Sequence, residues 1–209
     1  MINTIIVEDN KYIQKHFANL IAADERFYLT DVVADAFEAE KLCYKGVDLI
    51  LMDVLTLHRH SGLAAGRRIK EKWPNIKVVI ITSLIDPEIL AKAKTGCADS
   101  LWYKDHSSKE VLEVIERTLA GEKIFPDCSP VIKMENMFSD EISPAQLEIL
   151  RCYIRGMTYA EIGAKFGITS DGVRYHMREM QKKGGFKNKE ELIAAAIDSK
   201  LIVTMLKDE

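Results

Sequence analysis

The sequence predicts an α/β protein: a five-stranded, doubly wound parallel sheet, followed by a small all-α unit of four helices. Three observations predict this fold. The first 120 residues alternate between short apolar runs and segments with helical spacing. The apolar runs are nearly continuous, as expected for strands that are covered on both faces by helices. From Ile142 onward the pattern is helical only, with clear start and stop signals.

Five βα units are expected in the first 120 residues. The expected strands are Asn3–Val7, Tyr28–Val33, Val47–Met52, Lys77–Ile81 and Ser100–Tyr103. The expected helices are Lys11–Ala22, Ala36–Tyr44, Leu63–Lys72, Glu88–Thr95 and Lys109–Ala120. Such units form a doubly wound sheet whose binding site lies at the carboxyl ends of the strands.

Gly121 ends this alternation. The stretch 122–141 contains Pro126 and Pro130 and has no clear period, which indicates an interdomain linker. We therefore expect one domain over residues 1–121, a linker over residues 122–141 and a second domain over residues 142–209.

The second domain begins with a capping box, Ser143-Pro144-Ala145-Gln146, with proline at the first helical position. A second capping box, Thr158–Glu161, starts a short helix that runs to Phe166. The turn 167–169 leads into a third helix from Ser170 to about Lys183, and a fourth spans Asn188 to about Lys200. A turn of this length between the second and third helices predicts a helix-turn-helix unit.

Composition fits a soluble globular protein, with 47% apolar and 29% charged residues. No apolar run is long enough to span a membrane, and no signal peptide is expected, which predicts a cytoplasmic protein. The four cysteines form no CxxC pair, which favours reduced thiols over a metal or disulfide role. The net charge is −3, but residues 165–189 carry an excess of five positive charges, which favours a polyanionic partner there.

Reactive side chains stand where four of the expected strands end. Glu8 and Asp9 follow the first strand, Asp53 the third, Thr82 ends the fourth and Lys104 follows the fifth. Carboxylates gathered at one edge repel one another, so a hard divalent cation such as Mg²⁺ is needed to hold them together. The same cation can neutralise a phosphoryl group on one carboxylate, while a hydroxyl and an ammonium bind its remaining oxygens.

These residues resemble the receiver domain of two-component response regulators over about residues 2–120. Residues 98–105 are similar to the same stretch in the NarL/FixJ subfamily. The resemblance implies a flavodoxin-like fold and phosphorylation of Asp53 by a sensor histidine kinase. It also implies that Mg²⁺ is bound by Glu8, Asp9, Asp53 and the backbone carbonyl of Leu55. Thr82 would close on the phosphoryl group and Lys104 would pair with it.

The segment 54–62 departs from the receiver pattern because it lacks proline and is one residue longer. His58, Arg59 and His60 there form either an exposed loop or a device that tunes phosphotransfer. Leu101 stands where the family has its switch aromatic, and Trp102 lies beside it. It is therefore in doubt whether rotation of an aromatic ring transmits the phosphorylation signal in this chain. Trp102 is a candidate to substitute for that ring.

The third helix of the second domain has an apolar back and a basic front. Val173, Met177 and Met180 share one face, whereas Arg174, Tyr175, Arg178 and Lys182 project from another, as a helix that enters a major groove requires. Lysines 182, 183, 187 and 189 are candidates for phosphate contacts, and Thr169 in the turn is a further candidate DNA contact.

The motifs Glu161-Ile162-Gly163 and Gly172–Met177 resemble the LuxR-type helix-turn-helix, over about residues 142–203. This resemblance implies DNA contacts by Arg174, Tyr175 and Arg178. It assigns dimerisation to the last helix, for which we name Lys189, Leu192 and Ala196. His176 is assigned to structure.

The sequence thus predicts a transcriptional response regulator that binds paired DNA half-sites as a homodimer when Asp53 is phosphorylated. We do not expect an enzyme. One alternative is a pseudo-receiver that regulates transcription without phosphorylation. Another is a Mg²⁺-dependent phosphatase with an aspartyl-phosphate intermediate, but its second acid would fall on Leu55.

Overall fold

The computed structural model describes residues 1–105 and 110–203. These residues form two compact units, with the boundary after Ser129. No helix among the described residues has the length and apolar character needed to cross a membrane.

The first unit contains the predicted five-stranded sheet, and all of its strands are parallel, in the order β2-β1-β3-β4-β5. The strands are β1 (Ile2–Val7), β2 (Phe27–Val33), β3 (Leu49–Met52), β4 (Lys77–Thr82) and β5 (Ser100–Tyr103). The helices are α1 (Lys11–Ala22), α2 (Ala36–Leu42), α3 (Gly62–Lys72), α4 (Pro87–Lys92) and α5 (Val111–Leu119), with short helical turns η1 (Cys43–Lys45), η2 (Leu57–Arg59) and η3 (Ala93–Cys97). The predicted doubly wound fold is confirmed.

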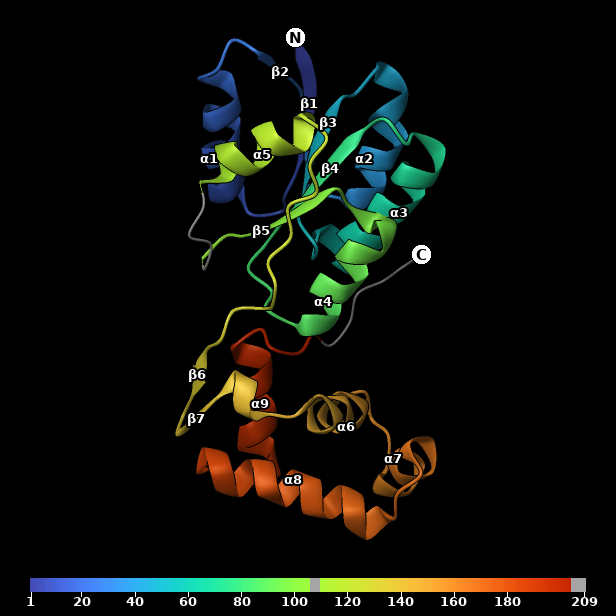
Figure 1. Cartoon of the computed structure of the whole chain (residues 1–209), viewed down its shortest axis with the longest axis vertical. Coiled ribbons are helices and arrows are strands. Elements are labelled where there is room, and N and C mark those ends of the chain that lie inside the picture. The colour runs from blue at the N-terminus through green and yellow to red at the C-terminus, as the bar shows by residue number, and fades with distance from the viewer. Residues whose placement is uncertain (106–109, 204–209) are drawn as a thin grey trace. The chain divides into compact units, whose positions relative to one another are not determined.

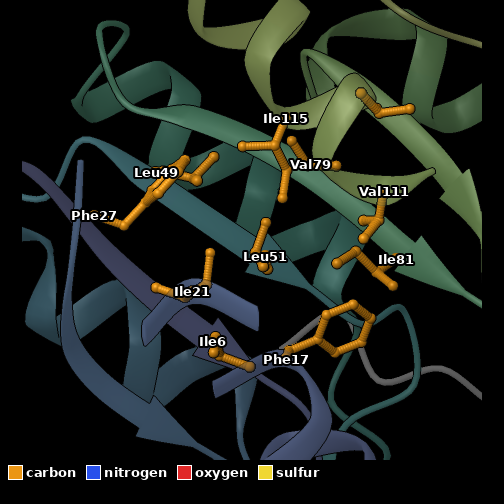
Figure 2. Close-up of a cluster of buried hydrophobic side chains, with 11 residues drawn as sticks. Ile6, Phe17, Ile21, Phe27, Leu49, Leu51, Val79, Ile81, Val111 and Ile115 are labelled. Atoms are coloured by element: carbon orange, nitrogen blue, oxygen red, sulfur yellow. The ribbon is translucent and has the colours of Figure 1, made fainter. Parts of the chain in front are cut away.

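Helices cover both faces of this sheet, with α1 and α5 on one side and α2, α3 and α4 on the other (Figure 1). Under α1 and α5 lies a cluster of buried side chains from the sheet and both helices (Figure 2): Ile6, Phe17, Ile21, Phe27, Leu49, Leu51, Val79, Ile81, Val111, Val114 and Ile115. Each fully buried side chain of this kind stabilises the fold by roughly 1.5–3 kcal/mol. This packing holds the strand ends in fixed positions.

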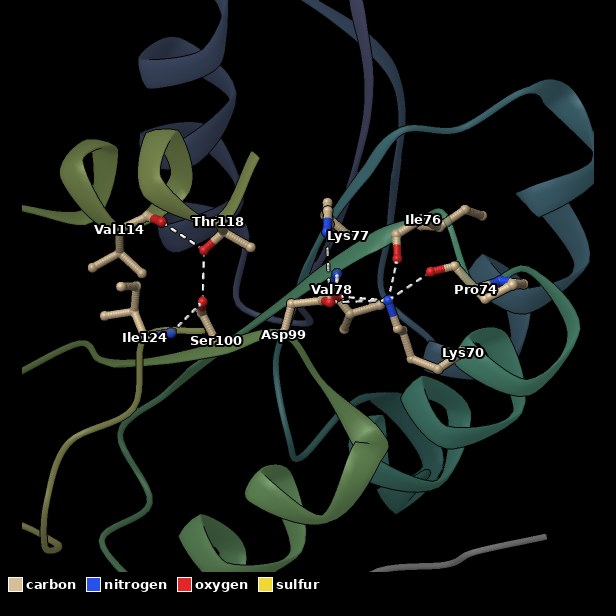
Figure 3. Close-up of polar contacts among 10 residues, drawn as sticks. All are labelled: Lys70, Pro74, Ile76, Lys77, Val78, Asp99, Ser100, Val114, Thr118 and Ile124. Carbon is tan, nitrogen blue, oxygen red and sulfur yellow. Dashed lines mark hydrogen bonds and ion pairs between the residues drawn. The ribbon is translucent and has the colours of Figure 1, made fainter. Parts of the chain in front are cut away.

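A polar network ties the end of α3 to the beginnings of β4 and β5 (Figure 3). The Lys70 ammonium donates to the Asp99 carboxylate at 2.8 Å and to the carbonyl of Ile76 at 2.9 Å. The Val78 backbone N–H donates to the same carboxylate at 2.9 Å. The charges of this largely buried pair are thus hydrogen-bonded, as a buried ion pair requires.

The stretch 122–141, expected as a linker, carries structure at both ends. Ile124 pairs with β5 in parallel, because the Leu101 N–H donates to its carbonyl at 2.9 Å. In the second unit, β6 (Lys133–Met134) and β7 (Met137–Phe138) form an antiparallel hairpin, followed by the turn η4 (Ser139–Glu141). The sequence offered no sign of the Ile124 pairing because it depends on a strand more than 20 residues away.

The second unit contains α6 (Pro144–Ile154), α7 (Tyr159–Phe166), α8 (Ser170–Gly184) and α9 (Lys189–Asp198). Both predicted capping boxes form, at Ser143 and at Thr158. A Cβ on Gly163 would lie 2.6 Å from the Ile168 carbonyl oxygen, so only glycine allows α7 to approach the turn this closely. Residues 204–209 of the expected second domain and Lys109 of an expected helix lie outside the described residues.

Candidate functional site

The carboxyl edge of the sheet gathers the predicted site residues. The β1–β3 register pairs Val7 with Met52, so Glu8 and Asp53 leave neighbouring strands at the same level. The Asp53 N–H donates to the Val7 carbonyl at 2.9 Å. Glu8 and Asp53 are buried, Asp9 is exposed, and carboxylate oxygens of all three lie within 4.8 Å of one another.

Lys104 joins two of these acids. Its ammonium donates to Asp53 Oδ2 at 2.9 Å and also to Glu8 Oε2. Its backbone N–H donates to the carbonyl of Thr82 at 2.9 Å, which fixes the end of β5 to the end of β4. Thr82 is fully buried, and its hydroxyl accepts from the Leu84 N–H at 3.0 Å. The predicted phosphoryl partner Lys104 is therefore paired with the two acids themselves in this structure.

Burial makes the ionised form of Asp53 costly. It raises the pKa of Asp53 to about 7, and the negative charge of Glu8 acts in the same direction, although the Lys104 ammonium opposes both. Partial burial and the charge of Glu8 also raise the pKa of Asp9. Burial by itself would lower the pKa of Lys104, but Asp53 and Glu8 raise it above its ordinary value. Asp53 and Asp9 therefore hold their protons more tightly than free carboxylic acids do, although the Lys104 ammonium opposes this.

The loop after Asp53 is held close to it. The Val54 N–H donates to Asp53 Oδ1 at 2.7 Å, which orients the carboxylate. A Cβ on Gly62 would lie 1.8 Å from the Asp53 carbonyl oxygen, so the chain can return this near only with glycine. Leu55, expected to offer its carbonyl to a metal, is partly buried and forms a β-bridge with Ser61.

The three basic residues of the unusual loop have different environments. His58 and Arg59 are exposed and have positive φ angles of 61° and 63°. His60 is partly buried, its Nδ1 lies 2.9 Å from the Asp35 carboxylate, and its ring stacks on Phe37 with centroids 4.1 Å apart. The loop is therefore exposed at its tip and anchored to the start of α2 by His60.

Trp102 does not lie on the side of β5 where a substitute for the switch aromatic is needed. Alternate residues of a strand point to opposite faces, so Leu101 and Tyr103 share one face and Trp102 the other. Trp102 packs edge-on against Phe17, beneath α1. Tyr103 is buried, and its hydroxyl lies 3.3 Å from Ser129 Oγ, at the end of the first unit. Tyr103 is thus the aromatic residue that shares the face of Leu101.

In the second unit, α8 has the buried back and exposed front that its sequence predicts. Val173, Met177 and Met180 are buried. The exposed residues of the opposite face include Arg174, Tyr175, Arg178 and Lys182. The Thr169 hydroxyl accepts from the Gly172 N–H at 3.0 Å and so caps α8. His176 is partly buried beside this face, with its ring near that of Tyr175.

Two of the lysines expected at phosphates are engaged within the unit. The Lys183 ammonium lies 3.3 Å from a carboxylate oxygen of Glu141, and that of Lys189 donates to the Tyr153 hydroxyl at 2.7 Å. Lys189 was also assigned to a dimer contact, and that assignment stays a prediction, in which its ammonium would have to leave Tyr153 to reach a partner.

The dimerisation assignment within α9 was wrong for two residues. Leu192 and Ala196 are fully buried, because this face of α9 packs into the unit's own core beside α8. A second copy cannot contact them while the unit keeps this fold. The exposed side of α9 carries Ala194 and Ile197 instead. The resemblance identified the helix but did not show which of its faces was already covered.

Gln14, a supporting residue of the acidic pocket, was not predicted from the sequence. Gln14 is buried on α1, and its amide donates to the backbone carbonyl of Glu8. A signal was present, because Gln14 stands at helical spacing from Phe17 and Ile21 on the buried face of α1. A polar residue at such a position needs a buried partner.

Comparison with protein families gives two matches on this chain. The family described as response regulator receiver domain matches residues 4–116. The family described as bacterial regulatory proteins, luxR family, matches residues 140–196. The two matches cover the two units described above.

Relatives of similar length agree with both matches. The response regulator protein VraR of Staphylococcus saprophyticus is 25% identical over 211 residues, covering 96% of this chain and 99% of VraR. VraR of Staphylococcus aureus strain Mu3 is 24% identical, with the same coverage.

Solved structures show the same fold at low identity. RcsB from Salmonella enterica serovar Typhimurium, bound to promoter rprA with the phosphomimetic BeF3-, has a TM-score of 0.61 and 16% identity; the match covers 93% of this chain and 98% of RcsB. A LuxR-family response regulator from Aurantimonas sp. has a TM-score of 0.55 and 23% identity; the match covers 60% of this chain and 89% of that one.

Proposed function

Because this chain belongs to the response regulators, with a receiver domain followed by a luxR-family DNA-binding domain, we propose that phosphorylation of Asp53 controls DNA binding by its second unit. The observation that carries this proposal is the convergence of Glu8, Asp9, Asp53 and Lys104 at one edge of the sheet. The proposed domains are a receiver over residues 1–121, a connecting segment over 122–141 and a DNA-binding domain from 142 onward.

The acidic pocket suits Mg²⁺. Three carboxylates that come within 4.8 Å of one another form the oxygen-rich donor set that a hard divalent cation prefers. We assign Glu8, Asp9 and Asp53 as side-chain ligands and the Leu55 carbonyl as a backbone ligand. When bound, Mg²⁺ offsets the charge of the acids and of an incoming phosphoryl group.

The side chains of this chain then have distinct tasks. Asp53 attacks the phosphorus of a phosphohistidine on the sensor kinase, so the P–N bond breaks and a P–O bond to Asp53 forms. The Lys104 ammonium exchanges its bond to Asp53 for one to a phosphoryl oxygen, and the Thr82 hydroxyl donates to another. Thr82 ends β4, the neighbour of β3, and Lys104 follows β5, the next strand along, so their movement changes the surface around β4 and β5.

The phosphorylation step is tested by mass spectrometry. Incubation with acetyl phosphate and Mg²⁺ should add one phosphate to the intact wild-type protein and none to Asp53→Ala. Asp31→Ala, which removes a partly buried acid of β2 outside the pocket, is the control and should still be phosphorylated. Phosphate on the Asp53→Ala variant would refute the assignment.

For DNA binding, we propose that α8 enters the major groove with Arg174, Tyr175 and Arg178, and that Thr169, Lys182 and Lys183 lie near phosphates. Arg174→Ala and Arg178→Ala should each weaken binding to a selected DNA site by roughly five- to one-hundredfold. Arg26→Ala removes an exposed positive charge from the first unit and should leave binding unchanged. Unchanged affinity in both α8 variants would refute the assignment of this face of α8 to DNA contacts.

We also propose a homodimer on paired half-sites, because the energies of two half-sites combine. The exposed side of α9, with Ala194 and Ile197, replaces Leu192 and Ala196 as the candidate contact.

A second candidate function is a regulator that works without phosphorylation, favoured by the atypical loop that His60 anchors. Absence of any acetyl phosphate adduct on the wild type would support it. The apolar Leu55 offers no second acid for phosphatase chemistry, so we propose no enzymatic turnover.

A further inference from the structure

The exposed front of α8 carries an acid, Asp171, beside its first arginine. Asp171 stands three residues before Arg174, four before Tyr175 and seven before Arg178, so all four lie on one stripe of the helix. Its side chain is 84% exposed. An acid at this place repels phosphates, which makes it costly on a surface that binds DNA only through its charge.

Asp171 is joined to the arginine beside it. A carboxylate oxygen of Asp171 accepts from Nη1 of Arg174. On its other side the Arg174 guanidinium lies 6.0 Å from the centroid of the Tyr159 ring, a cation–π contact with α7. Two contacts thus restrain Arg174, so less side-chain entropy is lost when it binds a target.

The pair presents two kinds of hydrogen-bonding group side by side. Arg174 offers N–H donors, and Asp171 offers carboxylate acceptors. In the major groove a G·C base pair shows two acceptors, guanine N7 and O6, followed by a donor, the cytosine N4 amino group. An arginine with a neighbouring carboxylate matches this order.

We infer that Asp171 and Arg174 together read one G·C base pair, with Arg174 donating to guanine and Asp171 accepting from the cytosine amino group. This inference rests on the proposed DNA-binding function. An A·T pair shows an acceptor, a donor and an acceptor, so the carboxylate would face thymine O4 and be repelled. Asp171 therefore determines specificity by rejecting the wrong pair as well as by binding the right one.

The test is a selection from duplexes with a randomised central region, using the full chain with acetyl phosphate and Mg²⁺ present throughout. Wild type should enrich a site that contains a preferred G·C position. Asp171→Ala should reduce that preference over A·T by at least about fivefold, while its total binding to unselected DNA stays equal or rises. Arg174→Ala should lose preference at the same position.

Glu179→Ala is the matched control. It also removes one exposed acid from α8, but Glu179 stands about two turns after Asp171 and five residues after Arg174, so it is not a neighbour of that arginine. This variant should bind unselected DNA at least as well as wild type and keep every base preference. Asp171→Asn is a second variant of nearly the same shape. Folding of α8 should survive both changes at Asp171, because its cap is Thr169, and circular dichroism checks this.

The outcomes separate this inference from the function on which it rests. If Asp171→Ala binds DNA with the wild-type base preferences, the inference is wrong and DNA binding stands. The same conclusion follows if the changes caused by Asp171→Ala and Arg174→Ala fall on different base pairs. If the wild type binds no DNA or enriches no sequence, the proposed function fails and the inference fails with it.

Discussion

Replacing Asp53 by asparagine should stabilise the first unit when no divalent cation is bound. The pKa of Asp53 is raised from 3.8 to about 7, chiefly by burial. Below pH 3.8 this shift has no effect on stability, because both the folded and the unfolded states keep the proton. Between 3.8 and 7 only the unfolded state loses the proton, so stability falls as pH rises. Above 7 the loss is complete.

One pKa unit corresponds to 1.36 kcal/mol, so the ionised carboxylate costs about 4 kcal/mol at pH 8 and about 2 kcal/mol at pH 5. Asp53→Asn removes this cost. Its free energy of unfolding should exceed that of the wild type at both pH values, and by more at pH 8. These figures are upper bounds, because the new amide also needs partners in the buried pocket.

Urea unfolding in EDTA measures the effect. Both tryptophans of the chain, Trp73 and Trp102, belong to the first unit, so their fluorescence reports its unfolding separately from that of the second. Asp48→Asn, an exposed acid before β3, is a control for the loss of a charge. The reasoning would be refuted if Asp53→Asn were less stable than the wild type at pH 8. It would also be refuted if the variant gained the same free energy of unfolding at pH 5 and at pH 8.

Three further predictions concern the metal, the helix-turn-helix and the loop. Mg²⁺ should raise the melting temperature of the first unit in the wild type, and Glu8→Gln should reduce this rise because one carboxylate is lost. The same rise in the variant and the wild type would exclude Glu8 as a ligand of the metal. Gly172→Ala should stabilise the second unit by up to about 1 kcal/mol, since its Cβ would meet only ordinary contacts. Gly163→Ala should destabilise the same unit by about 1–3 kcal/mol, because its Cβ would lie 2.6 Å from the Ile168 carbonyl oxygen. Unfolding in urea, followed by circular dichroism, distinguishes the two signs. His60 and the Phe37 N–H lower the pKa of Asp35 despite its burial, so Asp35 stabilises the fold above pH 3.8 and this contribution is lost as pH falls. The loss of unfolding free energy caused by Asp35→Ala should therefore shrink in acid. A loss that does not depend on pH would exclude the charge as its cause.

The sequence predicted the acidic pocket because a parallel sheet imposes strong geometric rules. Its strands end at one edge, so residues that follow different strands must meet there. Glu8, Asp53 and Lys104 do so, although 96 residues separate the first from the last. The capping boxes at Ser143 and Thr158 were predictable for a different reason: their hydrogen bonds join residues only three apart.

Contacts between side chains of separate elements were not predictable in this way. His60 pairs with Asp35 across 25 residues, and no local pattern distinguishes it from the exposed His58. The sequence also provided no means to choose the face of α9, and Leu192 was assigned to a dimer contact although it is buried. The face that a short helix buries depends on the neighbours that it meets after folding.

By itself, the sequence determined the order of strands and helices, the caps of the second unit and the residues that stand at each strand end. These properties follow from local hydrogen bonding and from the period of apolar residues. Only the tertiary structure decided that Lys104 bridges Glu8 and Asp53, that His60 anchors the loop and that α9 covers its own unit. Those contacts arise from packing between elements, where burial and charge act over distances that the local sequence does not encode.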